Sequence, residues 1–116
     1  MKIISLDSLK KTPVAMDGAK NLFKQVPIGA DDGSPLFCFR IFTVEPNGHT
    51  PYHTHPFEHL NYVIEGSGAL VTESGEERPL KKGDCALVLP EEKHCYKNTS
   101  TADNFVMICA VPKEYE

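Results

Sequence analysis

Apolar and polar residues alternate with a period of two along much of this chain, which is typical of strands that bury one face. Clusters of turn residues separate these segments roughly every ten residues. Strands are predicted at residues 21–28, 36–44, 60–65, 69–72, 85–89 and 104–111. Shorter strand-like segments between them, such as the one that carries the clustered histidines, bring the count to eight or nine. This count, with no segment of helical period, indicates an all-β sandwich or barrel.

The most apolar of these strands, at residues 36–44, ends at a predicted turn at residues 45–48. Alternation places Phe37 and Phe39 on one face of the strand and Arg40 on the other. An arginine in such a strand must either reach water or meet an anion. Arg40 is therefore a candidate for holding a substrate carboxylate, and a salt bridge at the edge of the barrel is the alternative.

The connections between strands favour a single domain. Residues 66–68, Gly-Ser-Gly, are predicted to form a tight hairpin between the strands on either side. Residues 1–18 carry mixed signals and are expected to form an irregular lead-in, while residues 113–116 form a charged tail. Since no linker, repeat or low-complexity segment interrupts the chain, one domain is expected over residues 1–116.

Composition narrows the classes of function. The chain is 41% hydrophobic and 24% charged, as globular proteins usually are. A net charge of -4 argues against nucleic acid and against an anionic membrane as partners, because both require basic patches. The first residues lack the unbroken apolar run of a secretion signal, so a cytoplasmic location is expected. The four cysteines form no CxxC pair and are expected to be reduced.

Three of the five histidines, His53, His55 and His59, fall within seven residues. Residues two apart on a strand point to the same face, so His53 and His55 can direct both rings at one point. Pro56 interrupts the strand and bends the chain, which lets the third ring approach from another direction. Neutral imidazole is the commonest metal ligand, and a mononuclear metal site is the hypothesis. Surface histidines in a loop are the alternative.

His94 is a candidate fourth ligand, although it lies 35 residues after His59. It follows a short strand that ends at Pro90, and it joins the cluster if this strand faces the same interior. Four imidazoles carry no charge, so a divalent ion keeps its full charge and polarises anionic or oxygen-rich substrates. An octahedral ion would keep two open positions, as catalytic sites do. Imidazole suits iron, copper, nickel and zinc.

Three other residues have competing interpretations. Cys109 could face the same cavity as the metal, or it could be a small buried hydrophobic residue. Glu58 neighbours His59 on an extended segment, so it is expected to point away from the metal. His49 precedes the cluster and is expected to face solvent. The GxSxG and GxGxxG motifs are absent.

Two stretches of the chain resemble the motifs of the cupin family. The first covers residues 47–66 and contains the three clustered histidines, and the second covers residues 83–98 and contains His94. Residues 40–46 and Cys109, shortly before the last proline, extend the match. The resemblance implies a cupin double-stranded β-helix, that is, a jelly-roll barrel.

The departures from the family pattern refine this resemblance. Asn47 stands at the first glycine position, the spacing on each side of Pro90 differs by one residue, and His59 replaces the usual glutamate ligand. The chain is therefore similar to small single-domain cupins with four histidines, several of which bind manganese. The resemblance implies a homodimer and a divalent ion, with Mn(II) favoured, held by His53, His55, His59 and His94.

These expectations lead to three hypotheses for the function. The first is a metal-dependent oxidoreductase, similar to a dioxygenase, that acts on a small organic anion with Arg40 and Cys109 lining the pocket. The second is a metal-dependent isomerase or epimerase that uses the ion as a Lewis acid. The third is a non-catalytic module that binds a small molecule or a metal complex.

Overall fold

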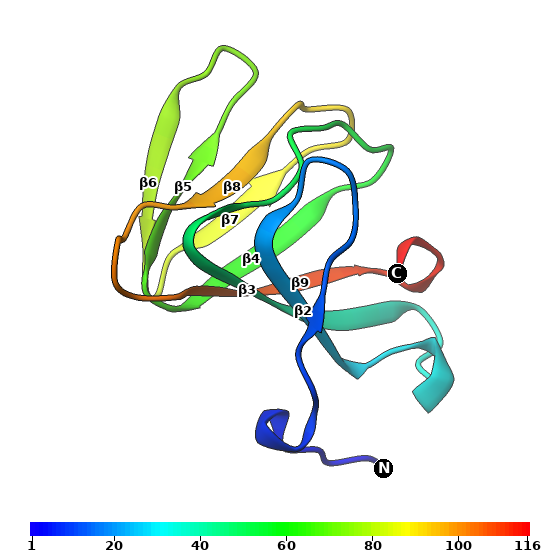
Figure 1. Ribbon diagram of the computed structural model, residues 1–116. Helices are drawn as coiled ribbons and strands as arrows, with labels where there is room; N and C mark the ends of the chain where they lie inside the picture. The colour runs from blue at the N-terminus through cyan, green and yellow to red at the C-terminus, as the bar shows by residue number, and fades with distance from the viewer.

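The computed structural model describes residues 1–116, and a single curled sheet of nine strands dominates it (Figure 1). The strands are β1 (Thr12–Pro13), β2 (Lys20–Ile28), β3 (Phe37–His49), β4 (His59–Glu65), β5 (Ser67–Val71), β6 (Glu77–Lys81), β7 (Cys85–Val88), β8 (Cys95–Asn98) and β9 (Phe105–Pro112). Three short 3-10 helices lie outside the sheet, namely η1 (Leu6–Ser8), η2 (Ala30–Asp32) and η3 (Lys113–Tyr115). The prediction of an all-β fold in a single domain is confirmed. None of the helices could cross a membrane.

The strands pair in the order β6-β5-β8-β3-β9-β4-β7, and β2 and β1 extend the sheet from β3. All of the pairs are antiparallel. The long strand β3 joins the two parts of the sheet, because its first part pairs with β9 and its last residue, His49, pairs with Lys97 of β8. The strands therefore curve around a shared interior, with the β5–β6 hairpin at the upper left of the view (Figure 1).

The predicted turn at residues 45–48 is wrong, because β3 continues through it to His49. The register against β2 shifts here, since Lys20 pairs with His49 while Leu22 pairs with Val44. Asn47 has a positive φ of 65°. The turn-forming residues therefore produce a bulge that bends the strand, and they do not end it.

The predicted hairpin at residues 66–68 is also wrong. β4 pairs with β7 and β9, whereas β5 pairs with β6 and β8, so this segment carries the chain between the two parts of the sheet. Gly66 has a φ of 77°, and a Cβ at this position would overlap the carbonyl oxygen of Asn104. The glycine is thus required by a close approach of two backbones. The hairpin that does form joins β5 to β6, with Thr72 N–H donating to the Glu76 carbonyl at 2.9 Å.

Inward-facing side chains from both parts of the sheet form the core. The main cluster contains Leu22, Val44, Val63, Val88, Tyr96, Phe105 and Met107, and a smaller one contains Cys38, Cys109 and Val111. The alternation of exposure predicted for β3 is confirmed from Phe37 to Arg40, with Phe37 and Phe39 pointing outward, but it does not continue to Ile41, which is 4% exposed. Phe37 and Phe39 are 58% and 39% exposed, while Cys38 between them is 1% exposed. The core fills one part of the interior and leaves space for a cavity in another.

Candidate metal centre

The segment that carries the clustered histidines, residues 50–58, is a loop and not the strand that was expected. Prolines at positions 51 and 56 limit its backbone hydrogen bonding. Several backbone hydrogen bonds hold it, including an isolated bridge in which His53 N–H donates to the His94 carbonyl at 3.1 Å and His94 N–H donates to the His53 carbonyl at 3.0 Å. The backbone itself therefore brings His94 beside the cluster.

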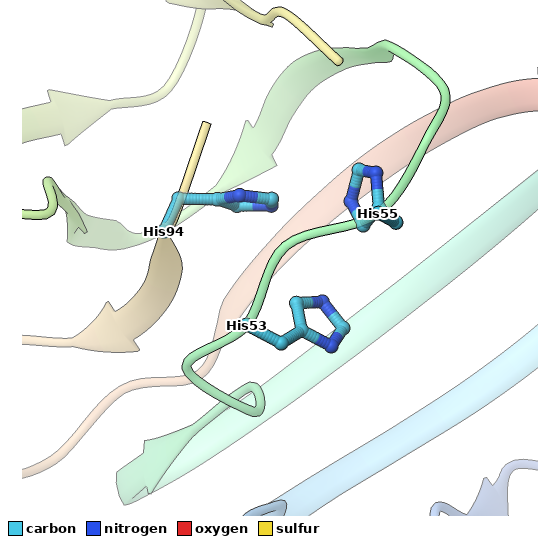
Figure 2. A group of neighbouring side chains, drawn as sticks. All are labelled: His53, His55 and His94. Atoms are coloured by element: carbon cyan, nitrogen blue, oxygen red, sulfur yellow. The ribbon is translucent and has the colours of Figure 1, made fainter. Parts of the chain in front are cut away.

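Three histidine rings surround a common space, as Figure 2 shows for His53, His55 and His94. One ring nitrogen from each lies within 4.8 Å of the others. The ring centroids are 4.9 to 5.6 Å apart, with edge-on arrangements between the rings. These three side chains could hold a metal ion, because imidazole nitrogens at such separations can reach one cation.

His59, the first residue of β4, lies at the edge of this group. Its ring centroid is 4.1 Å from that of His55 and 5.4 Å from that of His94. The pKa of His59 is lowered from 6.5 to about 2, mainly by burial and further by electrostatic repulsion of the protonated ring from neighbouring groups, among them His55 and Arg40. The ring is therefore neutral at physiological pH, as a metal ligand must be.

Hydrogen bonds orient two of the rings so that one nitrogen of each stays free. His55 Nδ1 donates to the Phe57 carbonyl at 2.7 Å, and His94 Nδ1 donates to the Glu92 carbonyl at 2.8 Å, in the neutral tautomers that these contacts select. The remaining nitrogen of each ring then offers a lone pair. His55 Nε2 and His59 Nδ1 are buried and have no hydrogen-bond partner. Bare nitrogens of this kind fit a metal ion.

A cavity of about 410 Å³ extends from all four histidines. Phe42, Phe57, Met107 and Tyr115 form much of its apolar wall. Its other polar residues are Lys24, Arg40, Thr50, Thr54, Asn61, Tyr96, Cys109 and Glu116. The arrangement can therefore bind a small molecule with an apolar body and a few polar groups.

Comparison with known proteins identifies the family. The model of the cupin domain matches residues 40–111. The chain belongs to the cupin family. A search of curated proteins found no match.

Solved structures show the same cupin fold. The polyketide cyclase RemF from Streptomyces resistomycificus is 30% identical, with a TM-score of 0.91 over 97% of this chain and 79% of that chain. A predicted oxalate decarboxylase from Thermotoga maritima is 17% identical, with a TM-score of 0.83 over 97% and 99% of the two chains. Ectoine synthase from P. lautus is 20% identical, with a TM-score of 0.75 over 97% and 78%.

The cavity of this cupin is lined by both residues that the sequence offered as pocket candidates, Arg40 and Cys109. Arg40 is 8% exposed, and its NH2 group donates to Cys109 Sγ at 2.9 Å. Its Nε also lies 3.5 Å from a carboxylate oxygen of Glu116, so a salt bridge accompanies the cavity position. Burial raises the pKa of Cys109, and the Arg40 guanidinium opposes this rise.

The two remaining sequence candidates lie outside the cavity. Glu58 is exposed, as expected for a residue that points away from the cluster. His49 is half-buried, and its Nδ1 contacts the Thr50 carbonyl at 3.1 Å, so the expectation of a solvent-facing role is only partly met.

Sequence reasoning missed several cavity residues of this cupin. Tyr96 donates its hydroxyl to Asn61 Oδ1 at 2.8 Å, and both residues are buried. An amide between Leu60 and Tyr62 in an apolar strand was a usable signal for Asn61. No local pattern marked Glu116, because its position in a charged tail is ordinary for a solvated residue.

Proposed function

We propose that this cupin is a metal-dependent enzyme in which His53, His55, His59 and His94 bind one divalent ion and the cavity binds a small organic anion. The observation that carries the proposal is the pair of buried nitrogens without partners, one on His55 and one on His59. Leaving such groups unpaired costs stability, and a cation shared with the other two rings would remove that cost.

The ligand set determines the chemistry available. A divalent ion held by neutral imidazoles keeps its full charge and would act as a strong Lewis acid on a bound carbonyl oxygen. Arg40 also supports the proposal, since its buried guanidinium can bind the anionic group of a substrate. Phe42 and Phe57 line the cavity with apolar surface, beside which electrostatic interactions are stronger than in bulk water.

The reaction class that we favour is redox-neutral isomerisation or ring closure of a substrate with several carbonyl groups. RemF, which is named as a polyketide cyclase, shares 30% identity across nearly the whole chain and supports this choice. Such reactions develop negative charge on a carbonyl oxygen, and a cationic site stabilises that charge in the transition state. The isomerase hypothesis from the sequence belongs to this class.

The oxidoreductase hypothesis is the second candidate. An all-imidazole ligand set also suits redox-active iron and copper, and the four histidines of this chain supply only imidazole. Manganese is favoured by the resemblance to four-histidine cupins. Here the small organic anion would be oxidised by dioxygen, so the reaction would need both oxygen and a redox-active ion.

The metal site is tested by elemental analysis of purified protein. We expect His53→Ala and His94→Ala to lower metal affinity by at least a factor of about ten, given that even residues supporting metal ligands have effects of this size. His49→Ala is the matched control, because His49 lies outside the cavity, and it should keep the metal. His59→Glu should keep the metal and change its spectrum. Normal metal content in both alanine variants would refute the site.

The reaction class is tested with zinc, manganese and iron forms of the protein. Each form is given a panel of polycarbonyl acids, with and without oxygen, and products are identified by mass spectrometry. Turnover by the zinc form without oxygen supports the Lewis-acid reaction, and turnover only with oxygen and a redox-active ion supports the oxidoreductase. Binding without turnover in every form would favour a non-catalytic module.

We also propose that the protein is a homodimer. The outer face of β4 and β7 carries Leu60, Tyr62 and Leu87, which are 49%, 43% and 57% exposed. Contiguous apolar surface of this kind marks an interaction site. A symmetric interface must be complementary to itself, and a face without charges meets this requirement. Light scattering tests the proposal, and a monomer at all concentrations would refute it.

A further inference from the structure

The segment 113–116 folds back onto the mouth of the cavity. The ring of Tyr115 stacks on Phe57 at 4.1 Å with an interplanar angle of 17°. Phe57 in turn stacks on His55 at 4.1 Å with an angle of 12°. A continuous stack of three rings therefore leads from this segment to the histidine cluster, and Tyr115 and Glu116 both line the cavity.

Glu116 places its carboxylate between two cations of the cavity wall. Its Oε1 lies 2.9 Å from Lys24 Nζ, and its Oε2 lies 3.5 Å from Arg40 Nε. The Glu116 side chain is only 17% exposed. A carboxylate thus already occupies the position at which an organic acid would meet both positive charges.

The contact with Arg40 is incomplete. The Nε atom is buried and has no hydrogen-bond partner, since 3.5 Å is an ion-pair separation and not a hydrogen bond. The NH2 group is used on Cys109 Sγ, which is a weak acceptor. A carboxylate that came closer than Glu116 does would satisfy the guanidinium better, because arginine and carboxylate match in a two-bond geometry.

The position between Lys24 and Arg40, called the carboxylate seat below, lies on the same inner surface as the histidines. Arg40 is in register with Cys109 on β9, and Cys109 is in register with Asn61 on β4. Asn61 is two residues from His59 on the same strand, so the two side chains share a face. A molecule held at Arg40 would therefore extend toward the histidine cluster.

We propose that Lys24 and Arg40 form the binding site for the carboxylate of an organic acid, and that Glu116 occupies it as an internal stand-in. The segment 113–116 is then a plug that an anionic ligand displaces. The assignment of this ligand as the substrate rests on the function proposed above. The competing explanation is a purely structural ion network that holds the segment against the barrel.

Benzoate and its neutral amide, benzamide, are suitable probes because they differ mainly in charge. Binding is measured by calorimetry on the unaltered chain and on Glu116→Gln, with Glu114→Gln as the control, since Glu114 is exposed and makes no ion pair. We expect Glu116→Gln to bind benzoate at least tenfold more tightly, with benzamide affinity and the control unchanged. Lys24→Gln and Arg40→Gln should lose benzoate affinity. The proposal would be overturned if Glu116→Gln tightened benzamide binding as much as benzoate binding, or if it did not tighten benzoate binding.

Hydrogen exchange of the unaltered protein supplies a second test that depends on no variant. Saturating benzoate should speed amide exchange in residues 113–116, because the plug is released, and benzamide should not. Slower exchange in that segment would show a structural clamp and overturn the proposal.

The calorimetry is repeated in a His53→Ala background, which separates the two proposals. If Glu116→Gln still tightens benzoate binding but not benzamide binding in that background, the carboxylate seat is supported even when the metal site is refuted. If Glu116→Gln tightens benzoate binding when His53 is present but not in the His53→Ala background, a seat built by Lys24 and Arg40 is overturned.

Discussion

One pair of neighbouring cross-strand rows on strands β3, β9 and β4 has the opposite polarity to that of an ordinary sheet. One inner row, in direct cross-strand register, consists of Arg40, Cys109 and Asn61, all of which are buried. The neighbouring outer row begins with Phe39 and Leu60, which are 39% and 49% exposed. Antiparallel sheets usually bury the apolar face and expose the polar one.

This inversion fits the two roles proposed above for these strands, ligand binding on one face and dimerisation on the other. Buried polar groups are retained only when they are paired or serve a ligand, because desolvation is costly. The inner row is paired within itself and with Tyr96, and it faces the cavity. Apolar groups exposed on the outer row gain nothing from water, and a second copy of the chain would bury them. Under the function and the homodimer proposed above, the inner face would serve chemistry and the outer face would serve assembly.

Truncation of the inner face should have the largest effect on stability. Met107 is 2% exposed and packs in the main core, so Met107→Ala leaves a cavity and should lower the free energy of unfolding by about 2–5 kcal/mol. Leu87→Ala on the outer face is the control and should cost less than about 1 kcal/mol in the monomer. Urea unfolding measures both, and equal losses would contradict the assignment of the two faces.

The period-two pattern predicted six of the nine strands and the two faces in the first part of β3, but not which face lies inside. Which face of β3 points inward depends on how the sheet closes, and the bulge at Asn47 contributes to this closure by bending the strand. Local residues such as Asn47 and Gly66 signal a special backbone conformation without saying whether it makes a turn, a bulge or a crossover. Both were interpreted as turns, and pairing with distant strands determined the outcome.

The candidate site was more predictable than the path of the chain. His53 and His55 converge although their segment is a loop, because the bridge to His94 positions it. Spacing along the sequence carried that information. Glu116 and Lys24 could not be found, since they meet across 92 positions of sequence and each resembles an ordinary surface charge.

Acidification should destabilise the metal-depleted protein, because the partly buried histidines of the inner face resist protonation in the folded state. The pKa of His59 is lowered from 6.5 to about 2 by burial, and burial also lowers the pKa values of His53 and His94. Between the unfolded and folded pKa values the unfolded state binds more protons, so stability present above pH 6.5 is lost as the pH falls toward 2. For His59 alone the loss is about 1.4 kcal/mol per pH unit. Thermal unfolding at pH 5 to 8 checks this, and a flat profile would contradict it.

A charge on the outer face should weaken assembly and leave the fold intact. Leu87→Asp puts a carboxylate on β7, where Leu87 is 57% exposed, so the monomer tolerates it. In a symmetric dimer the change brings two like charges into an apolar contact, and we expect at least tenfold weaker dimerisation, or about 1.4 kcal/mol. Sedimentation measures the effect. Ser74→Asp in the exposed β5–β6 turn is the control, and an equal effect there would argue against this interface.

The smallest effect should come from a single hydroxyl on the inner face. Tyr96→Phe removes the donor to Asn61 Oδ1 while keeping the ring packed in the core, so the amide oxygen is left buried and unpaired. We expect a loss of about 1 kcal/mol in the free energy of unfolding, because an intramolecular hydrogen bond contributes about that much. Tyr62→Phe on the outer face is matched in chemistry, and at 43% exposure it should cost almost nothing. If the two variants unfold at the same urea concentration, the buried pair contributes no stability, and its retention in the cavity wall must then be explained by the ligand alone.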